Sequence, residues 1–286
     1  MIKVTNLTYI YQQGMPYEKK ALDNVSFEIK KGTFTAVIGH TGSGKSTLIQ
    51  HMNALVKPTS GKIEIDGLDI TDPKCSMRDV RRKVGLVFQY PEHQLFEETV
   101  YKDIAFGPRN MGLSEEEIKQ RVMHAAEFTG IPDSLLDKSP FELSGGQKRR
   151  VAIAGVLAMQ PKVLILDEPT AGLDPKGRDS ILDRLSILHK SEPEMTILFV
   201  SHSMEDVARI AENVLVMGHG KAVMHGSVAE VFEKSEMLRK IGLDVPQITE
   251  LTHGLIENGV KIRPDIYTVK FAAEIFAELL READNV

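Results

Sequence analysis

The spacing of hydrophobic positions changes twice along this chain of 286 residues. In its first third, short runs separated by Gly32, Gly61 and Gly67 predict strands. Positions 114–160 then repeat mainly at helical spacing, and runs that are apolar throughout follow, as in buried parallel strands. The predicted strands are Ile2–Leu7, Ala21–Ile29, Thr33–Ile38, Lys62–Ile65, Val84–Phe88, Val163–Leu166, Thr196–Val200, and a closing hairpin of Asn213–Met217 with Lys221–Met224.

Segments with helical spacing of apolar residues lie between these predicted strands. Apolar spacing predicts a helix over Lys45–Val56, and a second helix runs from Gln147 to about Met159. Ser114 and Glu117 have the spacing of a capping box, which opens the helical stretch. A helical inset within a strand–helix alternation predicts an α/β core with a helical subdomain, here at about residues 90–160.

The pattern changes again after about Asp244. Two short amphipathic helices are predicted, one ending near Gly259 and one starting near Val269. Such helices cannot form a core by themselves, so we expect them to pack on the main domain or on a partner. We therefore divide the chain into a main domain, 1–244, and a C-terminal extension, 245–286, that supports a dimer.

Composition and charge narrow the class of protein. Hydrophobic residues make up 42% and charged residues 26%, which is typical of a globular chain. The net charge of −5 argues against nucleic acid as the main partner. The single cysteine, Cys75, favours a reducing cytosol. The longest apolar run, Val151–Met159, is too short to span a bilayer, so any work at a membrane is expected from the water side.

A glycine-rich loop lies between a predicted strand and a predicted helix. It fits the pattern G-x-x-x-x-G-K-S/T, in which glycines let backbone N–H groups curl around a phosphate. The helix N-terminus adds partial positive charge, Lys45 adds a cation, and the Ser46 hydroxyl can bind Mg²⁺. The loop therefore predicts a nucleotide with β- and γ-phosphates and Mg²⁺ as ligands, and the family resemblance described below implies that the nucleotide is ATP. The predicted ATP-binding residues here are Gly39, His40, Thr41, Gly42, Ser43, Gly44, Lys45, Ser46 and Thr47.

Two adjacent carboxylates follow the apolar strand Val163–Leu166. The carboxyl ends of parallel strands are where α/β sheets bind ligands. We interpret Asp167 as a Mg²⁺ ligand, and Glu168 as the group that orients or deprotonates the attacking water. Two neighbouring carboxylates repel each other, and a bound cation removes that cost.

The segment Leu143-Ser144-Gly145-Gly146-Gln147 resembles the signature of the ABC ATPases. A serine and two glycines before a helix provide a second anion-binding helix end. In ABC ATPases this segment contacts the γ-phosphate bound by the opposite subunit. The resemblance therefore implies that each ATP site is built from two chains. The resemblance also implies an α/β fold: a P-loop NTPase (RecA-like) core with an antiparallel β subdomain, a helical signature subdomain and a small C-terminal α-rich extension.

Other residues match the family's landmarks in order and spacing. Gln89 resembles the glutamine that touches Mg²⁺ and the attacking water, and His202 resembles the switch histidine that contacts the γ-phosphate. Asp174 closes a loop, Ala171 to Asp174, that resembles the one coupling the two sites across the dimer. Tyr11 resembles the aromatic residue that stacks on adenine, with Tyr9 as a near competitor. The sequence departs slightly from the family's usual pattern at Lys148-Arg149-Arg150 and at Ser201-His202-Ser203.

The run from Phe88 to Val100 is similar to the energy-coupling factor (ECF) group, whose members import vitamins or transition-metal ions. The C-terminal extension also resembles that group. The resemblance implies a peripheral protein on the cytoplasmic face of the cell membrane. Its implied partners are a paralogous ATPase subunit in a heterodimer, a transmembrane coupling protein and a cargo-binding membrane protein. Glu92, Glu97 and Glu98 form an acidic step that would receive arginine-bearing helices of the coupling protein.

Two other functions are alternatives to transport. An ABC-type ATPase acting on DNA or the ribosome would carry long coiled-coil insertions or two cassettes, and a basic face would be expected. Neither insertions nor a second cassette is present. In a P-loop phosphotransferase the signature segment would have no role. Such an enzyme would turn over ATP rapidly only in the presence of an acceptor substrate, so rapid turnover without an acceptor would favour the transport ATPase.

Overall fold

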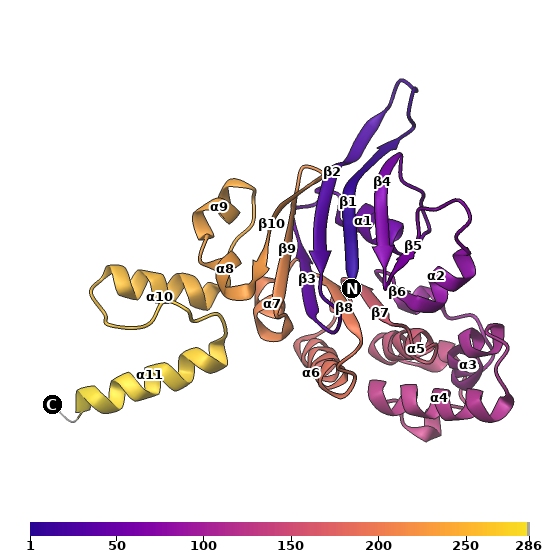
Figure 1. The fold of residues 1–286 in the computed structure, drawn as a ribbon. Coiled ribbons are helices and arrows are strands. Elements are labelled where there is room, and N and C mark those ends of the chain that lie inside the picture. The colour runs from indigo at the N-terminus through magenta and orange to yellow at the C-terminus, as the bar shows by residue number, and fades with distance from the viewer. Residues whose placement is uncertain (285–286) are drawn as a thin grey trace.

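The computed structural model describes residues 1–284 and contains two β-sheets with helices around them (Figure 1). A six-stranded sheet has the order β10-β9-β3-β8-β7-β6, and a four-stranded sheet has the order β2-β1-β4-β5. The strands are β1 (Ile2–Tyr11), β2 (Lys19–Ile29), β3 (Phe34–Ile38), β4 (Ser60–Ile65), β5 (Leu68–Asp69), β6 (Val84–Val87), β7 (Val163–Asp167), β8 (Thr196–Val200), β9 (Asn213–Gly218) and β10 (Lys221–Ser227).

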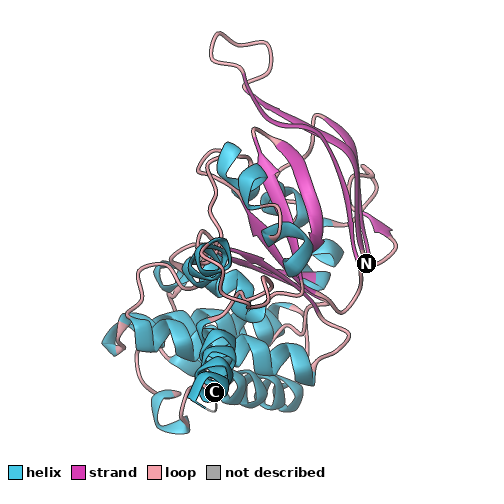
Figure 2. Ribbon diagram, turned by 90° about the vertical axis from the view of Figure 1, so that its left-hand side faces the viewer, coloured by secondary structure: helices cyan, strands magenta, loops and turns pink. Residues whose placement is uncertain are grey.

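The helices separate into groups that cover different parts of these sheets (Figure 2). Short 3₁₀ helices, labelled η, connect some of them. The helices are α1 (Lys45–Met52), α2 (Met77–Lys83), η1 (Pro91–Gln94), α3 (Val100–Asn110), α4 (Glu115–Thr129), η2 (Asp133–Leu135), η3 (Pro140–Glu142), α5 (Gly145–Leu157), α6 (Pro175–Ser191), α7 (Met204–Ile210), α8 (Val228–Phe232), α9 (Ser235–Lys240), α10 (Gln247–Glu257) and α11 (Val269–Asp284).

The centre of the larger sheet is parallel and buried on both faces. Strands β3, β8, β7 and β6 run parallel, β9 is parallel to β3, and β10 closes the sheet as an antiparallel hairpin with β9. Val163 and Ile165 of β7 face α1 and the smaller sheet, whereas Leu164 and Leu166 face α5 and α6. Successive side chains of a strand point to opposite faces of the sheet. Because both faces of this sheet are covered, every position along these strands needs an apolar residue. This explains the continuous apolar runs, and the predicted α/β core is confirmed.

The helical inset has a hydrophobic core of its own. Buried residues of α3, α4 and α5, among them Ile104, Val122 and Val151, pack together apart from the sheets. The predicted capping box is confirmed, because the Ser114 side chain accepts from the Glu117 backbone N–H and the Glu117 carboxylate accepts from the Ser114 backbone N–H. The helix therefore begins where the sequence predicted.

The helix that follows the glycine-rich loop is shorter than predicted. It ends at Met52 rather than Val56. Ala54 has a positive φ of 53°, so the chain turns there into the left-handed region. The Asn53 side chain donates to Val84 O at 2.6 Å, which anchors this turn to the larger sheet. Tertiary contacts thus end the helix before its apolar pattern does.

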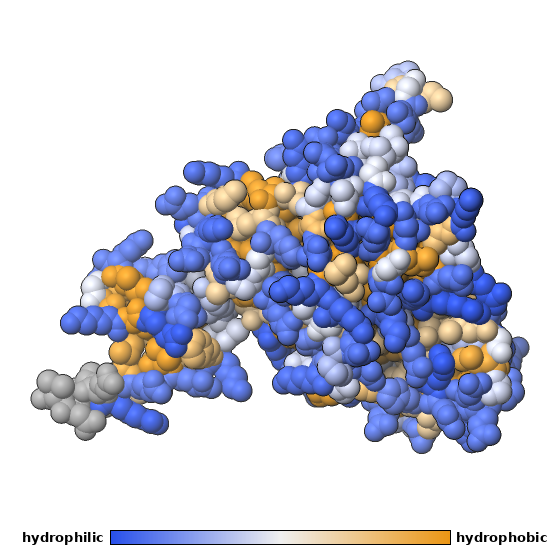
Figure 3. All heavy atoms as spheres, in the orientation of Figure 1, coloured by the Kyte–Doolittle hydropathy of each residue, from blue (hydrophilic) through white to orange (hydrophobic). Residues whose placement is uncertain are grey.

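The C-terminal helices α10 and α11 form an arm that projects from the main body (Figure 1). The base of the arm packs on the main domain, where Tyr267 lies against Phe232 with ring centroids 5.8 Å apart. Leu251 of α10 and Val269 and Leu280 of α11 are exposed, and apolar side chains gather on the arm (Figure 3). Within residues 1–284, no helix combines the length and apolar character that a bilayer span requires.

Candidate active site

The glycine-rich loop connects β3 to α1, and two of its glycines are required by close packing. A Cβ on Gly44, whose φ is +92°, would lie 2.5 Å from Ala21 O. A Cβ on Gly39 would lie 2.4 Å from Met217 O. Because atoms cannot approach so closely, the loop can follow this path only with glycine at both positions. The backbone amides before α1 are thereby held in a tight curve at the helix N-terminus.

Lys45 begins α1 and turns its side chain back across the loop. Its ammonium group donates to Gly39 O at 2.8 Å and lies 3.4 Å from His202 Nε2. Burial lowers the pKa of the Lys45 ammonium, and the charges of Glu168 and Asp167 oppose that effect. A buried cation with so few partners is suited to bind the phosphates of a nucleotide.

Asp167 is the last residue of β7, and its side chain reaches the start of α1. The carboxylate is only 8% exposed and hydrogen-bonds with Ser46. Burial raises its pKa to about 6, the neighbouring Glu168 contributes to that rise, and Lys45 and Ser46 oppose it. A divalent cation would offset this electrostatic cost. One carboxylate, one hydroxyl and nucleotide phosphates are oxygen ligands of the kind that Mg²⁺ uses, so these residues fit the predicted metal.

Glu168 is the meeting point of side chains from three neighbouring strand ends. Its carboxylate accepts from Gln89 Nε2 at 3.1 Å and lies 2.9 Å from His202 Nε2. Gln89 follows β6, Glu168 follows β7 and His202 follows β8, which are adjacent in the sheet. Glu168 also has a φ of 49°, a conformation uncommon for a residue with a side chain, and its N–H donates to Val200 O at 3.0 Å. Backbone strain of this kind is concentrated at functional sites.

The signature segment lies on the surface and satisfies its own polar groups. Ser144 caps α5 and forms a capping box with Gln147, at 2.9 Å and 3.4 Å. Open space surrounds the Cβ positions of Gly145 and Gly146, so another molecule could approach the backbone there. Within the described residues, no hydrogen bond joins this segment to the glycine-rich loop. The loop's helix α1 packs on β2, whereas α5 packs against α3 and α4.

The aromatic candidates differ in their surroundings. Tyr11 is 38% exposed, and its hydroxyl lies 3.2 Å from Thr47 Oγ1 at the start of α1. Tyr9 instead packs on the hydrophobic core and against the His51 ring, at a centroid distance of 4.6 Å. The geometry therefore favours Tyr11. Asp174 is exposed and caps α6 by accepting from a backbone N–H in the first turn of that helix.

One functional candidate was missed, and one expectation was wrong. Glu92 was expected to face a transmembrane partner, but only 16% of its side chain is exposed. Its two carboxylate oxygens accept from Arg149 Nε and Nη2 at 3.1 Å and 2.8 Å, within the same chain. Glu98 pairs with Lys102 of the same chain, but its side chain stays 82% exposed. The functional candidate that sequence reasoning does not identify is Arg149, whose only sequence signal is its place in the basic run after the signature segment.

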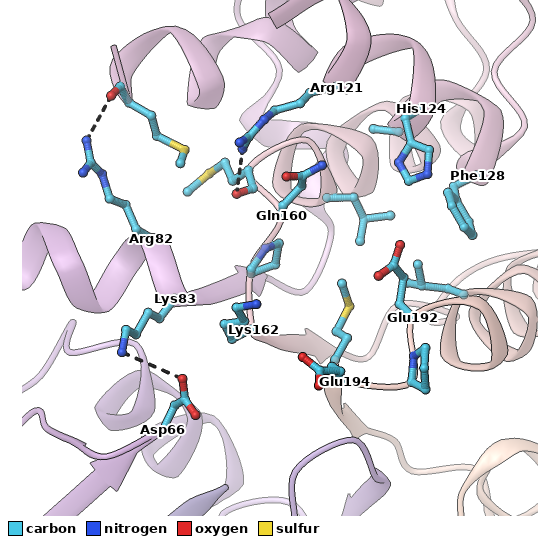
Figure 4. A pocket seen from close by; sticks show the side chains of 18 residues that line it. Asp66, Arg82, Lys83, Arg121, His124, Phe128, Gln160, Lys162, Glu192 and Glu194 are labelled. Atoms are coloured by element: carbon cyan, nitrogen blue, oxygen red, sulfur yellow. Dashed lines mark hydrogen bonds and ion pairs between the residues drawn. The ribbon is translucent and has the colours of Figure 1, made fainter. Parts of the chain in front are cut away.

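A cavity of about 580 Å³ lies away from these residues (Figure 4). Its lining includes Lys83, Lys162 and Met195, which immediately precede β6, β7 and β8. It is therefore at the amino ends of the parallel strands, whereas the cluster around Glu168 is at their carboxyl ends. Because ligands of open α/β sheets bind at the carboxyl ends, we assign the chemistry to the Glu168 cluster.

The ABC transporter family profile matches residues 22–171. The chain belongs to the ABC transporter family. It is 59% identical over 285 residues to the energy-coupling factor transporter ATP-binding protein EcfA2 of Caldanaerobacter subterraneus subsp. tengcongensis, covering 100% of this chain and 99% of that protein. The predicted membership of the ECF group of ABC ATPases is thus confirmed.

Solved ABC structures confirm the predicted fold class. The structure of cbiO1 from Clostridium perfringens, described as part of the ABC transporter complex cbiONQ, matches with a TM-score of 0.75 and 44% identity, covering 88% of this chain and 98% of that one. A dimeric ATP-binding cassette, MJ0796, in a post-hydrolysis state with ADP and Pi matches with a TM-score of 0.71 and 30% identity, covering 80% and 99%. This ABC chain is accordingly an ATPase that serves transport. The roles of individual residues and the division at residue 244 stay predictions.

Proposed function

We propose that this ABC ATPase binds ATP and Mg²⁺ at the glycine-rich loop and hydrolyses ATP in a dimer to power an ECF-type importer of vitamins or transition-metal ions. The observation that carries the proposal is the convergence of Lys45, Asp167, Glu168 and His202 at one sheet edge, while Ser144 faces outward. Such a site has a base and a cation but lacks the second anion-binding helix end. A neighbouring molecule would supply it.

In the proposed mechanism, each side chain has a separate task. Lys45 holds the β- and γ-phosphates, and the Ser46 hydroxyl with the Asp167 carboxylate would hold Mg²⁺, which would neutralise the phosphate charge. Glu168 accepts the proton of the attacking water. Gln89 and His202, which already contact the Glu168 carboxylate, orient that carboxylate and the γ-phosphate.

The dimer proposal has support from a relative and from this chain's own surface. MJ0796 is described as a dimer with ADP and Pi. In this chain, the exposed residues Leu251, Val269 and Leu280 give the C-terminal arm an apolar surface that a second subunit could cover. We propose a paralogous ATPase as that subunit. ATP binding between the subunits would draw them together, and hydrolysis would release them.

Contact with the membrane is proposed at the segment after Gln89. Phe96 and Phe106 are 58% and 42% exposed and meet edge to face with centroids 4.9 Å apart. Glu97 and Glu98 immediately follow Phe96 in the sequence. An apolar pair next to carboxylates fits an arginine-bearing helix of a transmembrane coupling protein, which would hold this chain at the cytoplasmic face of the membrane. A separate membrane protein would bind the cargo.

The Glu168→Gln variant tests the proposal. It should keep ATP binding, abolish phosphate release and trap an ATP-bound dimer, as measured by a phosphate assay and by light scattering after gel filtration. Glu116→Gln, an exposed position in α4, is the matched control and should behave like the unmodified protein. Steady-state hydrolysis by Glu168→Gln would show that the base is misassigned. Full activity in a monomer would contradict the dimer.

A further inference from the structure

We propose that Arg149 is a positioning residue that ties the signature helix to the catalytic loop of its own chain. This inference rests on the proposed function, in which the first turn of α5 serves the neighbour's nucleotide. Through Arg149, engagement of that helix end by a neighbour would be transmitted to Gln89 and Glu168. The link would therefore make one ATP site sensitive to the other.

Arg149 lies one turn into α5 and is only 2% exposed. Besides its two contacts with Glu92, its Nη1 donates to Pro169 O at 3.1 Å and to Ala171 O at 2.6 Å. The guanidinium carbon lies 5.9 Å from the centre of the Tyr90 ring. One side chain thus joins α5 to the segment after Gln89 and to the segment after Glu168.

The energetics favour a specific role over simple packing. Burying a guanidinium group is costly unless its donors are satisfied, and an apolar residue of similar size often stabilises such a site as well or better. The planar fork matches a carboxylate in two bonds, which fixes direction as well as distance. Arg149 therefore sets the orientation of α5 relative to η1 and to the Pro169–Ala171 backbone.

The Pro169–Ala171 segment, which Arg149 contacts, is also bound from its other side. Thr170 Oγ1 donates to Asp206 Oδ2 at 3.0 Å, and Arg178 Nε donates to Asp206 Oδ1 at 2.6 Å. Asp206 is 2% exposed, so this second contact is buried as well. Glu168, with its positive φ, immediately precedes this segment. Restraint from both sides is what a strained catalytic conformation needs to persist.

A movement of α5 would therefore reach the catalytic carboxylate by a short route. If a neighbour engages Ser144, α5 shifts as a rigid helix, and Arg149 carries the shift to the carbonyls of Pro169 and Ala171. The hydrogen bonds of Arg149 described above go to Glu92 and to these two carbonyls, and none of them goes to Lys45, which donates to Gly39 O and lies against His202. The expected kinetic consequence is therefore a change in turnover rather than in ATP affinity.

The Glu92→Gln variant tests the inference in the full-length, dimer-forming protein. It keeps the size of the side chain and one acceptor but removes the charge that orients Arg149. We expect kcat to fall at least about tenfold while KM for ATP changes less than about threefold, with the folded fraction unchanged by circular dichroism. Glu116→Gln makes the same change at an exposed position of α4 and should leave both constants unchanged.

A double-mutant cycle that combines Glu92→Gln with Ser144→Ala distinguishes a positioning role of Arg149 from a purely structural one. If Arg149 transmits the engagement of Ser144, the combined loss in kcat should be at least about fivefold smaller than the product of the single losses. Multiplicative losses, an unchanged kcat in Glu92→Gln, or a kcat loss that only follows the folded fraction would overturn the inference. Failure of the proposed function is separate, since it would appear as the absence of dimer-dependent hydrolysis in the unmodified protein.

Discussion

Replacing Asp167 by asparagine should stabilise the nucleotide-free protein while destroying its activity. The pKa of Asp167 rises from the ordinary 3.8 to about 6, chiefly because the carboxylate is buried and secondly because Glu168 is adjacent. Ionising Asp167 therefore costs about 3 kcal/mol more in the folded than in the unfolded chain. The Asp167→Asn substitution would keep the shape of the side chain and avoid that cost, at the expense of the metal ligand.

The pH dependence follows from the direction of the shift. Below pH 3.8 both states bind the proton, and the cost is absent. Between 3.8 and about 6 the folded state binds more protons than the unfolded state, so its stability falls as the pH rises, and above about 6 the cost is complete. The stabilisation by Asp167→Asn should thus be about 1 kcal/mol larger at pH 8 than at pH 5.

Urea unfolding at pH 5 and pH 8, without nucleotide and with EDTA, measures this difference. Any packing defect of the amide contributes equally at both pH values and cancels. Asp174→Asn is the matched control, because it removes a carboxylate from an exposed helix cap where asparagine caps equally well. The reasoning is refuted if the effect of Asp167→Asn on the unfolding free energy differs by less than about 0.5 kcal/mol between the two pH values, or is larger at pH 5.

Three further substitutions test other parts of the structure. Tyr11→Ala should raise KM for ATP about tenfold through lost stacking, whereas Tyr9→Ala should mainly lower the unfolding free energy; a larger KM effect for Tyr9→Ala would reverse the assignment. Gly44→Ala should destabilise the chain by more than about 1 kcal/mol and abolish ATP binding, because its Cβ would meet a carbonyl of β2, while Gly42→Ala, with open space around it, should cost less in a thermal melt. Ser114→Ala should lower the unfolding free energy, measured by urea unfolding, by about 1 kcal/mol because the capping box is lost. No change would mean that the cap does not contribute to stability.

The amino-acid sequence alone determined the features that depend on neighbouring residues. The glycine-rich loop, the Ser114 cap and the apolar strand before Asp167 are recognisable because glycine conformations, capping bonds and the burial of a strand on both faces leave their pattern within a few positions. The order of these motifs was also enough to indicate the family. The helix end at Met52 was mispredicted because its cause, the bond from Asn53 to Val84 O, lies outside the helix.

Only the tertiary structure decided which distant residues meet. The sheet order β8-β7-β6 brings His202, Glu168 and Gln89 into contact, and no local pattern encodes that order. Glu92 has the sequence context of a surface carboxylate, but its bond to Arg149, 57 positions away, leaves its side chain only partly exposed. The physical reason is that burial and ion pairing depend on how elements pack against one another, whereas sequence patterns report only what each element needs by itself.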